Sequence, residues 1–136
     1  MARRRRLLGG AAPRFAVHFA LMLLDIEQRR IEPDITIVEL AGRLALGRES
    51  QRIETLVEEL ARSGERKVVL DMGRIDYIDS AGVGLVALAA GKLRENGGRV
   101  IVVAPEGRVL HLLQMTQMTA IVTVVATPAE ATAAFA

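Results

Sequence analysis

The chain has no cysteine and no tryptophan, and aromatic residues make up only 3% of its 136 residues. The absence of cysteine excludes disulfide bonds, thiolate catalysis and zinc sites with cysteine ligands. The shortage of aromatic rings disfavours a surface on which the bases of single-stranded nucleic acid would stack. The two histidines, His18 and His111, do not have the spacing of metal ligands. We expect His111 to lie on a helix surface or half-buried.

Hydrophobic residues make up 51% of the chain and charged residues 25%, which is typical of one globular domain. The sequence pI of 9.7 comes from a local feature. Five of the 18 basic residues, Arg3 to Arg6 and Arg14, lie in the first 14 positions, where there is no acid. The rest of the chain carries 13 basic against 16 acidic residues. The charge therefore predicts a basic tail and no direct binding of nucleic acid.

Residues 1–22 are interpreted as a basic and apolar N-terminal extension that is flexible, and residues 23–136 as the folded domain. Residues 15–24 form an apolar run behind the arginines, as in an export signal, but the run has no small-x-small cleavage site. It is also too short to span a bilayer, which takes roughly 20 residues. A membrane-surface anchor and an export signal stay open as alternatives.

Hydrophobic periodicity predicts an α/β fold. Alternating runs at 24–28 and 35–40, around a turn at 32–34, are typical of an antiparallel hairpin. The apolar stripe in 48–63 predicts a one-sided helix. Further strands are expected at 67–72, 99–104 and 121–126, and further helices at 82–96, at 109–115 and from Pro128 onward. The order ββαβαβαβα predicts a mixed sheet of about five strands flanked by about four helices.

The most informative segment is Ile78–Leu85, between the third predicted strand and the second predicted helix. Asp79 and Ser80 are residue types that cap a helix N-terminus, where negative charge is favoured. Gly82 and Gly84 follow, so another protein could approach the serine hydroxyl closely. One phosphate on Ser80 would change the charge of this surface. The segment therefore favours a regulatory switch site over a catalytic site.

Catalytic and metal-binding patterns are weak. Ser80 has no identifiable histidine base, so a nucleophilic triad is unsupported. Asp71, Asp76 and Asp79 gather at one predicted strand end and could hold a hard cation, but a cap and a turn explain two of them. We expect no metal site and no cofactor.

A dinucleotide-binding pattern is the main competing motif. Gly82-x-Gly84-x-x-Ala87 matches G-x-G-x-x-G/A. However, about ten residues separate it from the preceding strand, whereas the first glycine normally follows the strand directly. Asp79 would also repel the phosphates. A small nucleotide-binding protein stays an unfavoured alternative.

The hairpin is followed by Gly42-Arg43-Leu44 and a helix, and residues 67–71 then lead into 77–84. This arrangement resembles the STAS domain. More narrowly, the chain is similar to bacterial anti-sigma factor antagonists over about residues 23–135. The resemblance implies a STAS-like sandwich in the cytoplasm, with no catalysis of its own. A STAS-fold scaffolding or regulatory subunit of another complex, such as a transport system, is the alternative.

The resemblance implies partner switching. In the family, the unphosphorylated antagonist binds an anti-sigma factor, usually a GHKL-type serine kinase, and frees the sigma factor. The kinase phosphorylates the serine after the aspartate, which is Ser80 here, and so ejects the antagonist. A PP2C-type phosphatase reverses the modification. Structural roles stay open beside this one: Ser80 as a helix cap only, and Gly82 and Gly84 as sites of close packing.

Two positions depart from the family pattern. Ala81 stands where many relatives carry a second serine or threonine, and Ala45 stands where the first loop often has an acid that contacts the partner. Helical spacing also places Leu85 and Leu88 opposite the predicted core face, alongside Lys92, as an outward apolar pair, unless a neighbouring helix covers them. The candidate partner-binding residues are Asp79, Ser80, Ala81, Gly82, Gly84, Leu85, Lys92, Gly42, Arg43 and Ala45.

Overall fold

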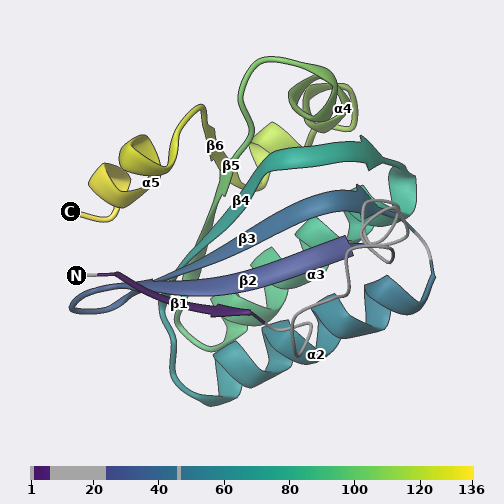
Figure 1. Cartoon of the computed structure of the whole chain (residues 1–136). Helices are drawn as coiled ribbons and strands as arrows, with labels where there is room; N and C mark the ends of the chain where they lie inside the picture. The colour runs from purple at the N-terminus through teal and green to yellow at the C-terminus, as the bar shows by residue number, and fades with distance from the viewer. Residues whose placement is uncertain (1, 7–23, 46) are drawn as a thin grey trace, which may run out of the picture.

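A computed structural model describes residues 2–6, 24–45 and 47–136 (Figure 1). Within these ranges the strands form one sheet in chain order, β1(Ala2–Arg6), β2(Leu24–Ile31), β3(Ile35–Leu44), β4(Lys67–Ile78), β5(Arg99–Val103) and β6(Thr123–Val125). The helices are α2(Arg48–Arg62), α3(Ser80–Glu95), α4(Arg108–Met115), the 3-10 turn η2(Met118–Ala120) and α5(Pro128–Ala134).

The predicted order ββαβαβαβα is confirmed from β2 to α5. β2 and β3 form the antiparallel hairpin, and β3 to β6 are parallel. β4 is longer than predicted, because two register irregularities in its pairing with β3 let it continue alongside that strand to Ile78. β6 is shorter than predicted, because η2 precedes it and the Val122 N–H donates to the carbonyl of Met118.

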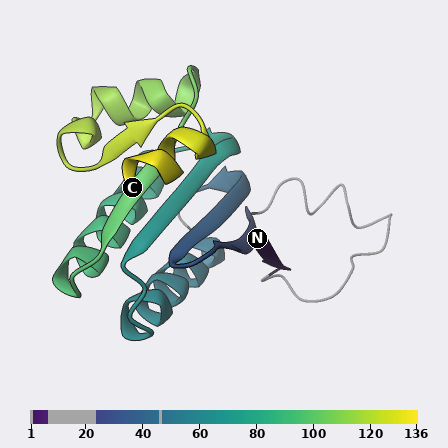
Figure 2. The same cartoon turned by 90° about the vertical axis from the view of Figure 1, so that its left-hand side faces the viewer.

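Helices cover both faces of the sheet (Figures 1 and 2). α2 and α3 lie side by side on one face, where Ile53 and Leu93 join the largest apolar cluster with Leu70 of β4. α5 lies on the other face, where Ala131 packs against Val69 and other strand residues. Along β4 and β5, consecutive side chains therefore point alternately into the apolar cluster on one face of the sheet and into the cluster on the other face. This explains their continuously apolar sequences, which are typical of strands covered on both sides.

The N-terminal segment contributes an edge strand that the sequence did not predict. β1 pairs antiparallel with β2, with Arg3 opposite Arg30 and Arg4 opposite Arg29. Like charges at opposed positions weaken a strand pair. Residues 7–23, which include most of the apolar run 15–24, lie outside the described residues. None of the helices in the described ranges is long and apolar enough to cross a membrane.

We expect deletion of residues 1–22 to change the melting temperature of the domain by only a few degrees. The pairing of β1 sets arginine opposite arginine at two positions, which weakens a strand pair, and terminal segments commonly contribute little to stability. Thermal unfolding of the full chain and of residues 23–136, followed by circular dichroism, checks this. A large fall in melting temperature would show that the extension belongs to the core.

Candidate functional site

Asp79 and Ser80 lie where β4 ends and α3 begins. Asp79 is the N-cap residue, with extended backbone, and its Oδ1 accepts a hydrogen bond from the Gly82 N–H at 2.9 Å. Ser80 is the first residue of α3, and it is exposed. Its hydroxyl has no hydrogen-bond partner in the described part of the chain. Because Asp79 supplies the cap, the structure does not need the Ser80 hydroxyl for capping.

The two glycines after Ser80 have different environments. Gly82 is buried, and a Cβ built on it would overlap the carbonyl oxygen of Leu44 and lie 2.8 Å from Cγ1 of Ile78. Gly82 therefore allows the first turn of α3 to pack against the end of β3, and its prediction as a partner-binding residue is wrong. The packing interpretation, which covered both glycines, applies to Gly82 alone. Gly84 is exposed, and a Cβ there would meet nothing within 4 Å. Gly84 thus leaves a bare helix surface one turn beyond Ser80.

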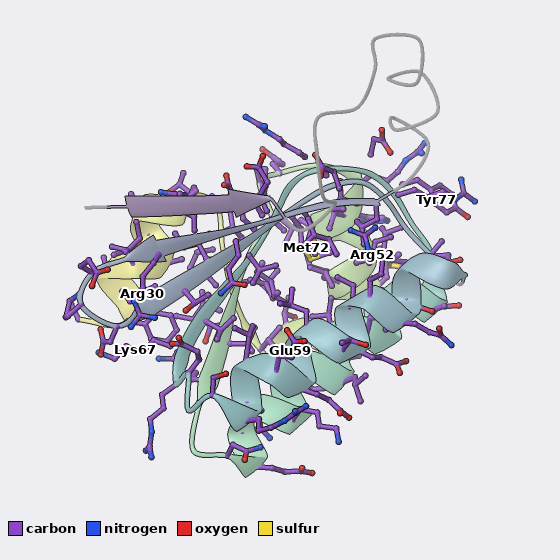
Figure 3. The ribbon with its side chains drawn as sticks, turned by 60° about the horizontal axis from the view of Figure 1, so that its bottom comes forward. Arg30, Arg52, Glu59, Lys67, Met72 and Tyr77 are labelled. Carbon is purple, nitrogen blue, oxygen red and sulfur yellow. The ribbon has the colours of Figure 1, made fainter. Side chains whose placement is uncertain are left out.

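Arg43 and Tyr77 form an exposed pair beside this surface. They are opposite each other in the register of β3 and β4, and the Arg43 guanidinium carbon lies 4.0 Å from the centre of the Tyr77 ring. This is a cation–π contact. Figure 3 shows Tyr77 at the end of the sheet away from Arg30 and Lys67. Arg43 was among the predicted partner-binding residues and Tyr77 was not, because the register irregularities that align the two residues leave no sequence signal.

The structure corrects the predicted outward apolar pair. Leu85 is only 6% exposed and belongs to the main core, so its prediction as a surface residue is wrong. Leu88 is half-buried and packs against the same core. The reason is that α3 contacts both the sheet and α2, so that its apolar face is wider than a single stripe. Lys92 also faces α2, where its Nζ lies 3.6 Å from a carboxylate oxygen of Glu58.

The prediction that Ala45 lies on the partner-binding surface is also wrong. Ala45 is only 7% exposed, so a partner cannot contact its side chain in this arrangement. An aspartate at this position would bury a carboxylate instead of placing it on a solvated rim, which is costly. Gly42 and Ala81 are half-buried. The predicted residues that are exposed beside Ser80 are therefore Arg43 and Gly84, while Asp79, like Ala81 and Gly42, is half-buried.

The aspartates of this region do not form a cation site. Asp71 Oδ1 accepts a hydrogen bond from the Gly73 N–H at 3.0 Å, as a turn residue within β4 does. Asp79 is engaged as the cap. Among the described residues, no group of three or more acids or histidines could hold a metal ion. His111 lies on the exposed side of α4.

Comparison with known proteins gives the family. Residues 28–131 match the STAS domain. BtrV of Bordetella bronchiseptica, which is named as an anti-sigma factor antagonist, is 38% identical over 89 residues, covering 63% of this chain and 77% of BtrV. The chain belongs to the STAS domain family.

Solved structures show the same fold. An anti-sigma factor antagonist from Mycobacterium paratuberculosis has a TM-score of 0.71 at 16% identity, covering 82% of this chain and 93% of that one. The Bacillus cell fate determinant SpoIIAA in its phosphorylated form has a TM-score of 0.64 at 20% identity, covering 82% and 99%. These likenesses confirm the predicted STAS-like architecture.

Stability measurements can show which of Asp79 and Ser80 caps α3. We expect Asp79→Ala to destabilise the domain by about 0.5–2 kcal/mol, because it removes the acceptor for the Gly82 N–H. Ser80→Ala should change the free energy of unfolding by less than about 0.5 kcal/mol, as exposed substitutions usually do. Denaturant unfolding of both variants checks the assignment. Equal losses would mean that Ser80 shares the capping role.

A matched glycine pair tests the packing of the first turn. Gly82→Ala should destabilise the domain by about 1–3 kcal/mol, because its methyl group overlaps the backbone of Leu44. Gly84→Ala should instead stabilise it by about 0.5–1 kcal/mol, since alanine favours a helix and meets no neighbour there. Urea titration of both variants measures the difference. A tolerated Gly82→Ala would contradict the close contact between α3 and β3.

Proposed function

We propose that this protein is an anti-sigma factor antagonist that acts by partner switching in the cytoplasm. The unphosphorylated form binds an anti-sigma factor, a serine kinase of the GHKL type, and thereby releases the sigma factor. Phosphorylation of Ser80 ejects the antagonist, and a PP2C-type phosphatase restores it. The protein acts by binding, without catalysis of its own.

The observation that carries the proposal is the exposed hydroxyl of Ser80, which has no bonding partner among the described residues and lies beside a cap supplied by Asp79. Such a hydroxyl can enter the active site of a kinase without breaking a contact that the fold needs. The bare surface at Gly84 and the half-buried Ala81 let a partner approach α3 closely. The relationship to BtrV, itself named as an anti-sigma factor antagonist, supports the same function.

A phosphate at Ser80 affects the complex more than the fold. It adds a charge of about −1.5 to −2 at pH 7. The positive end of α3 offsets part of this, by about 0.3–1 kcal/mol. A partner seated over Gly84 would have to desolvate the phosphate next to the Asp79 carboxylate, and burying an uncompensated charge is expensive. The modified chain stays folded and loses its partner.

The Arg43–Tyr77 pair borders the surface on the β3–β4 side. A guanidinium stacked on a ring keeps several N–H donors directed at solvent, and such groups are frequent in protein interfaces. We include both residues in the partner-binding surface.

The alternative function is that of a STAS-fold subunit of a transport complex. Such a subunit would bind its partner without phosphorylation, which distinguishes it from the partner-switching antagonist.

We expect Ser80→Asp to melt near the wild-type temperature but to bind the anti-sigma kinase more weakly by about 3 kcal/mol or more. Ser80→Ala should bind like wild type and resist phosphorylation. The kinase is first captured from the native host with the wild-type chain as bait. Calorimetric titration with each variant then measures the affinity, and phosphopeptide mapping after incubation with ATP locates the modified residue.

Ser63→Asp is the matched control, because Ser63 is an exposed serine at the far end of α2. It should bind the kinase as tightly as wild type. Labelling at a residue other than Ser80, or wild-type affinity of Ser80→Asp, would contradict the switch. Capture of a transport protein with no phosphorylation would favour the scaffolding alternative.

A further inference from the structure

A small pocket lies at the opposite end of α3 from Ser80. It has a volume of about 230 Å³ and is bordered by the last turns of α3, the start of β5 and the segment from Ile121 to Thr123. Arg94 of α3 and Arg99 of β5 both line it. In the part of the chain that the structure describes, no acidic residue contributes to the lining. The described residues thus give this pocket a positive charge with no compensating carboxylate.

Both arginines donate a hydrogen bond to the segment from Ile121 to Thr123. Arg99 Nη2 donates to Oγ1 of Thr123 at 2.9 Å, and Arg94 Nη2 donates to the carbonyl oxygen of Ile121 at 3.4 Å. The Phe135 ring centre lies 5.8 Å from the Arg99 guanidinium carbon. In the described ranges neither arginine forms an ion pair. Each guanidinium has five N–H donors, so most of them are left for a ligand.

The end of α3 does not cancel this charge. The last carbonyls of a helix normally present partial negative charge. Here three of them accept hydrogen bonds: Lys92 O from the Asn96 side chain at 2.9 Å, Arg94 O from the Gly97 N–H at 3.1 Å and Leu93 O from the Gly98 N–H at 2.7 Å. The guanidinium groups therefore dominate the electrostatics of the pocket.

We infer that this pocket binds a small phosphate-type anion between Arg94 and Arg99. Two guanidinium groups can each give paired N–H donors to phosphate oxygens, which is the geometry that favours arginine over lysine. The volume is below the range of about 300–1,000 Å³ that is typical of drug-sized ligands, so it suits phosphate or the phosphate end of a small ester. This site does not depend on the proposed switch at Ser80.

The test is a titration of the full chain with inorganic phosphate, followed by NMR of the arginine Nε–H groups. Ionic strength is held constant with chloride, because exposed charges are screened by salt. We expect saturable shifts at Arg94 and Arg99 and at the Gly98 amide. Arg99→Gln should weaken binding about tenfold, as expected for the loss of charged hydrogen bonds. The double variant with Arg94→Gln should not bind measurably.

Two further variants separate a built site from surface charge. Thr123→Val keeps every charge but frees the Arg99 side chain, so it should weaken binding several-fold. Arg62→Gln removes an exposed arginine at the end of α2 and should leave binding unchanged. Melting temperatures confirm that each variant is folded. Shifts that never saturate, or equal binding by Thr123→Val and wild type, would overturn the inference. Saturation with acetate but not with phosphate would also contradict it.

Discussion

The contact between the first turn of α3 and the end of β3 determines the geometry of the candidate site. Gly82 lies against the carbonyl of Leu44, with no space for a side chain. This close approach fixes where α3 begins and how it is rotated relative to the sheet. Once the helix is fixed there, the Asp79 carboxylate can reach the Gly82 N–H, and Ser80 is directed to the surface. The position of the serine is thus a consequence of packing two residues away.

The site has a structural half and a surface half. Asp79 and Gly82 hold the helix start, while Ser80 and Gly84 are exposed and make no contact that the fold requires. Modification or mutation of the surface half can therefore alter binding with little effect on stability. A chain in which the serine also capped the helix would have linked these two properties, because every change at the serine would also weaken α3.

Local patterns in the sequence were enough to predict the order of elements and to limit the cap to Asp79 or Ser80. Alternation and apolar runs identify β2 to β5, and Asp-Ser before a long apolar segment marks the start of α3. The failures concern contacts between elements. Leu85 was predicted on the surface because helical spacing was compared with one core face, whereas the sheet and α2 both cover α3. The pairing of Arg43 with Tyr77 depends on irregular strand register, which no local pattern records.

The cap also determines how a phosphate would act in the proposed switch. At a helix N-terminus an added phosphate can accept hydrogen bonds from the free N–H groups of the first turn. Here the Asp79 carboxylate already accepts from Gly82. A phosphate on Ser80 would add its charge next to that of the Asp79 carboxylate at the surface. In the proposed switch, a partner that approaches Gly84 would meet this charge, and its release would require no rearrangement of the fold.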